Sequence, residues 1–357
     1  MKILLVRLRL IGDVVFTTPA IRALRRQYPD AHITYLVEPA AAPVVARNPH
    51  IDRVWIVEHR RGWRRMADDV SLAWQARRAA FDLAIDLHGG PRSAWITWMT
   101  RAPVRVGYDV AGRAWMYTRV APRSRELGPR HSVVNQWDLL AALDPAFGAA
   151  PAPDTDRVEM PAAPEARQTV DARLDQAGVG PGEGVIVMHV SAGNPFRRWP
   201  ESSFAELAAA LATGAPNRRV LVTSGPSDRD AAHRVIADAR ARAGGAHARV
   251  LDGEGWSLDE LRAVMDRAAL FIGGDSGPLH VAATSDVPVV GLYGPTLPAR
   301  SAPWRPRAVP TASVDAGPLP CRPCDQRVCA PGDFRCLTGI GVGAVRQAAD
   351  AILERAR

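Results

Sequence analysis

The chain has 357 residues, which is more than a single typical domain and predicts two. Hydrophobic residues make up 47% of it, enough to exclude a disordered chain. The formal net charge is +8, but the arginines are spread over the whole length and predict no nucleic-acid partner; a basic surface favours phosphorylated sugars, nucleotides or an anionic membrane face.

The N-terminal stretch is apolar but is interrupted by Arg7 and Arg9 and lacks a small-residue cleavage site. It therefore predicts a first strand and not a signal peptide. No apolar run approaches the roughly 20 residues that a transmembrane helix requires. We expect a cytoplasmic protein.

Strand and helix patterns alternate through the first half, which predicts an α/β fold with a parallel sheet covered by helices on both faces. The expected strands are Ile3–Leu8, Ile33–Val37, Val54–Val57, Leu83–Leu87 and Val104–Val106. The expected helices are Ala20–Gln27, Pro39–Arg47, Trp63–Ala80, Ser93–Thr100 and His131–Leu143.

A carboxylate follows the first strand directly. Gly12 permits a sharp turn, and Asp13 then stands at the carboxyl end of the strand, the edge at which such sheets bind ligands. Thr18 and Pro19 predict a helix cap and the first helical residue. Asp13 could take a proton from an attacking hydroxyl; the alternative is that it only caps the turn.

The segment Asp144–Pro164 is rich in proline and alanine with little periodicity, as expected of an inter-domain connection. We expect a first domain over 1–150, a linker over 151–165, a second domain over 166–340 and a terminal helix over 341–357. The alternation restarts with strands Val185–Val190, Val220–Thr223 and Val250–Leu251 and helices Glu201–Ala212, Asp228–Ala243 and Leu258–Ala268, and a last helix covers Gly341–Arg355.

A loop of small residues, 191–194, follows the first strand of the second half. Its backbone N–H groups and the Ser191 hydroxyl could approach a diphosphate. Arg197 and Arg198, close behind, add charge and bidentate donors. The alternative is that the two arginines are simply solvated.

The run Phe271–Pro295 predicts a buried strand (Ala269–Ile272), a glycine-rich turn with Asp275 and Ser276, a helix opened by Pro278 and a further strand, Val287–Leu292. Such a turn leaves free N–H groups at a helix start, where an anion can bind. Asp275 and His280 could hold a sugar hydroxyl or a phosphate. The alternative is a tight turn with Ser276 as a helix cap.

Two common nucleotide-binding motifs are absent. No Gly-x-Gly-x-x-Gly follows the first strand, and a Walker motif cannot exist because Lys2 is the only lysine.

In order and spacing, these pieces resemble glycosyltransferase family 9, the heptosyltransferases of lipopolysaccharide core synthesis. The similarity runs along most of the chain. The matching motifs are Gly12-Asp13, Thr18-Pro-Ala20, Leu24-Arg25, Pro29, Asp86-Leu-His-Gly89, Arg92-Ser93, Arg105-Val-Gly-Tyr108, Arg197-Arg-Trp-Pro200, Ser257-Leu-Asp-Glu-Leu261, Gly274-Asp-Ser-Gly-Pro-Leu-His-Val-Ala-Ala283 and Tyr293-Gly-Pro-Thr296.

The resemblance implies a GT-B fold, in which two Rossmann-like domains face each other across a cleft and the C-terminal one holds the donor. It also implies an inverting enzyme that uses a nucleotide-activated sugar, typically ADP-heptose, without a catalytic metal or other cofactor. The acceptor would be a lipid-linked or other glycan at the inner face of the inner membrane.

The resemblance also assigns residues. Asp13 matches the general base, and Asp275, Ser276, Gly277 and His280 match the donor-site motif. Arg197 stands where the family usually has a phosphate-binding lysine, which keeps the charge but changes the donor geometry. Leu297-Pro298 stands where members often have Asp-Pro.

The stretch His59–Arg65 is basic and contains a tryptophan, in the half where the resemblance implies acceptor binding. Arg60, Arg61 and Arg64 are candidates to contact acceptor phosphates or an anionic membrane face. The alternative is a solvated helix start.

All four cysteines lie close together, as Cys321, Cys324, Cys329 and Cys336, in a proline- and glycine-rich loop over 317–337. Clustered cysteines in a chain without an export signal favour a metal over a disulfide. Four thiolates suit zinc or iron in a structural role. Free thiols and disulfides stay open as alternatives.

Three functions fit these observations. The first is heptosyl transfer to lipopolysaccharide core. The second keeps the fold and the donor but transfers to a protein or another surface glycan, and similar cysteine clusters in family relatives that modify proteins favour keeping it open. The third is a non-catalytic nucleotide-sugar-binding protein.

Overall fold

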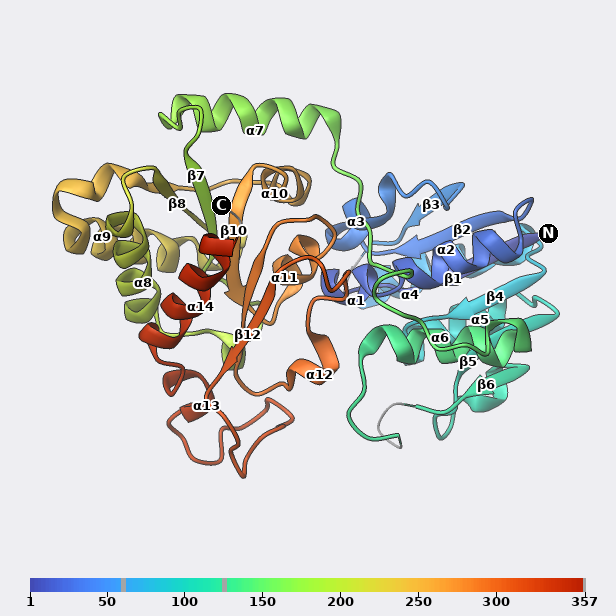
Figure 1. Cartoon of the computed structure of the whole chain (residues 1–357). Coiled ribbons are helices and arrows are strands. Elements are labelled where there is room, and N and C mark those ends of the chain that lie inside the picture. The colour runs from blue at the N-terminus through green and yellow to red at the C-terminus, as the bar shows by residue number, and fades with distance from the viewer. Residues whose placement is uncertain (59–61, 124–126, 356–357) are drawn as a thin grey trace. The chain divides into compact units, whose positions relative to one another are not determined.

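The computed structural model describes residues 1–58, 62–123 and 127–355, without the side chains of 63–65. The chain divides into two compact units, Met1–Pro161 (unit 1) and Ala162–Arg357 (unit 2). Each unit contains one six-stranded sheet with helices on both faces (Figure 1).

The sheet of unit 1 has the strand order β3-β2-β1-β4-β5-β6, and all of its pairs are parallel. The strands are β1 (Lys2–Val6), β2 (His32–Val37), β3 (Arg53–Ile56), β4 (Leu83–Asp86), β5 (Val104–Tyr108) and β6 (Arg119–Ala121). The helices are α1 (Ile11–Val15), α2 (Thr18–Gln27), α3 (Ala42–Ala46), α4 (Gly62–Arg78), α5 (Pro91–Met99) and α6 (Ser132–Leu143).

The sheet of unit 2 has the order β12-β11-β10-β7-β8-β9 and is also parallel. Its strands are β7 (Gly184–His189), β8 (Arg218–Thr223), β9 (Val250–Asp252), β10 (Ala268–Gly274), β11 (Val289–Tyr293) and β12 (Thr311–Asp315). Its helices are α7 (Pro164–Gln176), α8 (Glu201–Gly214), α9 (Arg229–Ala243), α10 (Leu258–Met265), α11 (Gly277–Ala282), α12 (Pro298–Ser301), α13 (Arg335–Thr338) and α14 (Val342–Arg355).

The central strand of unit 2 shows why the sheet is covered on both faces. In β7, Ile186 and Met188 belong to one core cluster, with residues of α8, α9 and α14. Val185 and Val187 belong to a second cluster, with residues of α7, α10 and α11. Side chains alternate between the faces of a strand, so a continuous apolar strand needs helices on both (Figure 1).

The turn expected at Gly12 is wrong in detail. The residue with a left-handed backbone is Leu10, at φ 68°, and Gly12 is buried inside the short helix α1. The cap expected at Thr18 is also displaced: Thr17 is the N-cap residue of α2, without a side-chain cap bond. The Thr18 hydroxyl instead donates to the Val15 carbonyl (2.8 Å).

Five further elements were not expected: the edge strands β6 and β12 and the helices α7, α12 and α13. The residues of β6 and β12 are largely exposed or half-buried, so they lack the apolar run that marks a buried strand. Helix α7 begins at Pro164, inside the stretch expected as a linker. In the described ranges, no helix has both the length and the apolar character to cross a bilayer.

The carboxylate at the end of β4 holds its loop together. Asp86 is fully buried and accepts hydrogen bonds from the hydroxyls of Tyr117 (2.6 Å) and Ser93 (2.9 Å) and from the backbone N–H groups of His88 and Gly89 (both 2.9 Å). Burial raises the pKa of Asp86 despite these donors.

Asp86→Ala is therefore expected to destabilise unit 1. The substitution leaves two hydroxyls and two backbone N–H groups in the interior without their hydrogen-bond acceptor. The expected loss is about 3 kcal/mol in the free energy of unfolding, measured by urea titration. Asp109→Ala, at an exposed aspartate of the same unit, is the control and should change it by less than about 0.5 kcal/mol. Equal losses in the two variants would contradict this account.

Candidate active site

Asp13 lies in α1, just past the carboxyl end of β1, with 30% of its side chain exposed. Its carboxylate forms an ion pair with Arg7. Arg7 Nη1 also donates to the carbonyl of Leu87 (2.7 Å), which directly follows the neighbouring strand β4. The carboxylate is thus anchored to the sheet edge through Arg7 while it keeps contact with solvent. Such a group can accept a proton from a bound hydroxyl.

A neutral histidine lies in the same electrostatic environment. Burial, together with the positive charges of Arg7 and Arg9, lowers the pKa of His88 to about 4, although Asp13 acts in the opposite direction. His88 is therefore an uncharged imidazole at neutral pH, able to donate or accept a hydrogen bond. Arg7 and His88 were not singled out from the sequence, although His88 lies in a motif that carries the family resemblance.

The acceptor candidates cannot be placed. Arg60 and Arg61 lie outside the described residues. Arg64 belongs to α4, but its side chain is likewise outside the description.

In unit 2, Asp275 follows β10 and is 2% exposed. Its Oδ2 accepts a hydrogen bond from the Thr296 hydroxyl (2.5 Å) and lies 3.3 Å from Arg197 Nη1, while Oδ1 lies 3.4 Å from His280 Nε2. Burial alone would raise the pKa of Asp275, but the contacts with His280, Arg197 and Thr296 outweigh it and lower the pKa to about 2. Asp275 is therefore ionised at neutral pH.

Arg197 is bound on two sides. Nη1 donates to the backbone carbonyl of Asp275 (3.0 Å), and Nε donates to the side-chain oxygen of Gln326 (2.7 Å). The side chain is 31% exposed. Within the described residues, Arg197 makes its contacts through Nε and Nη1, so Nη2 is the part of the guanidinium left for a ligand.

The loop after β7 uses its polar groups internally. The Ser191 hydroxyl donates to the carboxylate of Asp228, and Arg198 Nη2 pairs with the other oxygen of that carboxylate (2.8 Å). Arg198 Nε also donates to the Ala192 carbonyl (3.0 Å). Asp228, expected only as a helix start, is 5% exposed and organises this loop.

The glycine-rich turn places Ser276 at the N-cap of α11, but its hydroxyl makes no cap bond. It is buried and has no hydrogen-bond partner among the described residues. Gly277 is the first residue of α11, and His280 is 4% exposed, with its ring beside Asp275. The structure thus gathers Arg197, Asp275 and His280 at the carboxyl edge of the sheet, with Ser276 next to them.

The four cysteines are free thiols that line one cavity of about 240 Å³, together with Phe196, Pro295 and Phe334. Burial raises the pKa of Cys336, and the other three cysteines raise it further. Thiolates in this cavity therefore repel one another, and a bound cation would reduce this repulsion.

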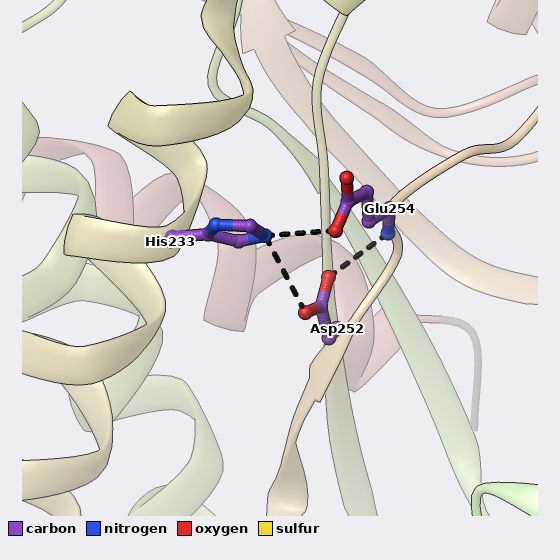
Figure 2. A group of neighbouring side chains, drawn as sticks. All are labelled: His233, Asp252 and Glu254. Carbon is purple, nitrogen blue, oxygen red and sulfur yellow. Dashed lines mark hydrogen bonds and ion pairs between the residues drawn. The ribbon is translucent and has the colours of Figure 1, made fainter.

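A second group with metal-ligand chemistry was missed because its members come from α9 and from the end of β9. In the described ranges, His233, Asp252 and Glu254 are the group whose ligand atoms all lie within 4.8 Å of one another; the cysteines are not such a group (Figure 2). His233 Nε2 is already 2.9 Å from Glu254, which also faces Arg229 at 3.6 Å. The side chains are between 40 and 48% exposed, so the group is explained as a surface ion-pair network.

Comparison with known proteins identifies the family. A model described as glycosyltransferase family 9 (heptosyltransferase) matches residues 70–330, well over half of the chain. Lipopolysaccharide heptosyltransferase 3 of Escherichia coli is 27% identical over 322 residues, covering 90% of this chain and 91% of the relative. Lipopolysaccharide heptosyltransferase 1 of Pseudomonas aeruginosa is 29% identical over 343 residues, covering 92% and 87%.

Solved structures agree on the fold. The family 9 glycosyltransferase of Veillonella parvula has a TM-score of 0.83 at 23% identity, covering 99% of this chain and 97% of its own. E. coli ADP-heptose lps heptosyltransferase II has a TM-score of 0.78 at 20% identity, covering 100% and 99%. E. coli heptosyltransferase WaaC with ADP has a TM-score of 0.71 at 21% identity, covering 99% and 100%.

The two six-stranded parallel sheets and these neighbours confirm the α/β, GT-B class of fold. The family model and the relatives confirm the resemblance found in the sequence motifs. The chain belongs to glycosyltransferase family 9, and it is a glycosyltransferase.

Proposed function

We propose that this protein is an inverting heptosyltransferase that moves a heptose from ADP-heptose to a lipopolysaccharide core acceptor. The observation that carries this proposal is the cluster of Arg197, Asp275, His280 and Thr296 at the carboxyl edge of the unit 2 sheet. Its support is that the curated relatives are lipopolysaccharide heptosyltransferases and that one structural neighbour was solved with ADP.

The charge of each donor residue determines which part of the donor it contacts. Negative charge builds on the diphosphate as the bond to the anomeric carbon breaks, and Arg197 stabilises it, helped by Arg198 and the loop N–H groups. Asp275 is ionised and would repel phosphate, so its role is to hold Arg197 and to accept a hydrogen bond from a sugar hydroxyl. Ser191, Ser276, Gly277 and His280 complete the donor-binding set.

Asp13 is the general base. It takes the proton of the acceptor hydroxyl as that oxygen attacks the anomeric carbon on the face opposite the diphosphate, which inverts the centre. Arg7 positions the carboxylate for this step. No cofactor takes part in the reaction.

The acceptor is a glycan at the membrane surface. Arg60, Arg61 and Arg64 bind its phosphates or the anionic headgroups around it. The enzyme then works in the cytoplasm, at the inner face of the inner membrane, and the formal charge of +8 suits that surface.

The test is turnover by the purified protein with ADP-heptose, compared with UDP- and GDP-sugars. ADP release and a glycosylated product are followed by mass spectrometry with a lipopolysaccharide core acceptor and, in parallel, a protein acceptor. Turnover on the core acceptor with ADP-heptose is expected. Product on the protein alone would favour the second acceptor class, and tight binding without turnover would favour the non-catalytic function.

The cysteine cavity is proposed to hold a structural zinc or iron ion through Cys321, Cys324, Cys329 and Cys336. Thiolate sulfur suits either metal, and the repulsion that raises the pKa of Cys336 favours a cation there. The sulfurs have to draw closer than they lie in the structure, because four thiolates at about 2.3 Å from one ion make a compact tetrahedron.

Purified protein is expected to contain about one zinc or iron ion per chain, measured by inductively coupled plasma mass spectrometry. Cys324→Ser should reduce that content and lower the melting temperature. His233→Ala is the control, since it removes a surface histidine and should leave the metal content unchanged. Metal-free protein in which all four thiols react with a thiol reagent would contradict the assignment.

A further inference from the structure

We propose that the cysteine-rich loop is part of the donor site and that Gln326, at its centre, is the residue that positions Arg197. The proposal rests on the proposed function, because it takes Arg197 as the phosphate-binding residue. It adds Gln326 and the cysteine-rich loop to that site, whereas the sequence motifs indicated the loop only as a metal site.

Gln326 contacts both the Arg197 side chain and the loop that carries Arg197. The side-chain oxygen of Gln326 accepts hydrogen bonds from Arg197 Nε (2.7 Å) and from Asn194 Nδ2 (3.0 Å). Asn194 in turn accepts a hydrogen bond from the backbone N–H of Phe196 (3.0 Å), which closes the turn that carries Arg197. One amide oxygen therefore ties together the side chain and the loop on which Arg197 is placed.

The backbone at Gln326 supports a specific role. Its φ of 59° lies in the left-handed region, which a residue with a Cβ rarely adopts. This conformation has an energetic cost, and the two hydrogen bonds that the Gln326 side chain accepts help to offset it.

The loop is also fixed to the glycine-rich motif. Arg322 is 4% exposed and donates to the carbonyls of Thr296 (2.7 Å) and Tyr293 (3.4 Å) while it pairs with Asp315 (2.7 Å). The N–H of Cys324 donates to the Pro295 carbonyl (3.3 Å). Thr296 is the residue that donates to Asp275, so the loop contacts the site through both Arg197 and the residues around Thr296.

The consequence is a guanidinium held from two sides. Gln326 takes Nε, and Asp275 takes Nη1. A planar guanidinium fixed at these two atoms has a fixed direction for Nη2, the donor left for the diphosphate. Without Gln326, Arg197 keeps its charge but loses that direction, so donor binding weakens although no phosphate contact has been removed.

The experiment is a double-mutant cycle on ADP affinity, measured by isothermal titration calorimetry with the full chain. Gln326→Ala alone is expected to raise the Kd for ADP about tenfold, as for loss of a hydrogen bond to a charged group. The partner variant is Arg197→Lys, which keeps the charge but has no Nε donor for Gln326. In that background, Gln326→Ala is expected to change the Kd less than about twofold.

The neighbouring residue supplies the control. Arg327 is 85% exposed and pairs with the exposed Asp325, so Arg327→Ala should leave the Kd within about twofold of the wild type. An effect of Gln326→Ala that persists in full with Lys at position 197 would overturn the proposal, because loop damage acts whichever residue stands there. So would an unchanged Kd in Gln326→Ala.

Failure of the proposed function gives a different pattern. If Arg197→Ala leaves ADP affinity unchanged, or if the wild type does not bind ADP, then the assignment of Arg197 as a donor residue is wrong. If Arg197→Ala weakens ADP binding and Gln326→Ala does not, the donor site stands and the positioning role of Gln326 is refuted.

Discussion

Asp13→Ala is expected to lower heptosyl transfer about a thousandfold, within the range that a positioned general base contributes. Its affinity for ADP is expected to stay within about twofold of the wild type. The two effects separate because Asp13 belongs to unit 1, whereas the proposed donor residues Arg197, Asp275 and His280 belong to unit 2. Turnover is measured as ADP release with saturating acceptor, and affinity is measured by calorimetry.

Asp13→Asn is the matched variant, since it keeps the size of the side chain but removes the base. It should be as inactive as Asp13→Ala. Both variants leave Arg7 without its carboxylate partner, so a melting curve must show that unit 1 stays folded. Asp109→Ala, at an exposed aspartate of the same unit, controls for the loss of one negative charge and should keep full activity. Turnover by Asp13→Asn close to that of the wild type would exclude Asp13 as the base.

The fold was largely predictable because buried parallel strands have a recognisable sequence pattern, a continuous run of apolar residues. β1, β4, β7 and β10 are continuous apolar runs, and each was expected within two residues of at least one of its bounds. The edge strands β6 and β12 were missed for the converse reason, since strands that are covered on fewer sides need fewer apolar residues. Propensity and periodicity therefore predict the centre of a sheet better than its edges.

The grouping of the candidate donor residues was predictable only where they are close in sequence. Asp275, Ser276 and His280 lie within six positions of one another, and the turn that carries them has a recognisable glycine pattern. Asp228 could not be predicted as a partner of Ser191 and Arg198, because the contact joins residues from two different βα connections. Gln326 is 129 positions from Arg197, and a glutamine in a cysteine-rich loop carries no pattern of its own.

These long-range contacts also change how two adjacent arginines are interpreted. Arg197 and Arg198 are adjacent and look equivalent in the sequence, yet the structure separates their partners. Arg198 pairs with Asp228 and the loop backbone, whereas Arg197 pairs with Asp275 and Gln326. Arg198 therefore contacts the loop, so its help to the donor is secondary, and Arg197 is the arginine that contacts the glycine-rich motif.

Arg197→Ala should accordingly have the larger effect on the donor. We expect the Kd for ADP to rise about 30-fold, the equivalent of about 2 kcal/mol for charge-assisted hydrogen bonds. Turnover at saturating donor should fall by a further hundredfold or so, because charge on the diphosphate is greater in the transition state than in the bound donor. Calorimetry with ADP and initial rates with ADP-heptose measure the two effects separately.

Arg197→Lys decides between charge and geometry. A lysine keeps the positive charge, but it has no Nε and Nη1 by which it could be held at two points at the same time. If charge alone matters, Arg197→Lys restores both ADP affinity and turnover. If the direction of the guanidinium set by Asp275 and Gln326 matters as well, ADP affinity recovers more than turnover does. A mobile ammonium group still binds the diphosphate, but it is not preorganised at the position where negative charge develops on the leaving group. The arrangement of Arg197 between two fixed acceptors favours the second outcome.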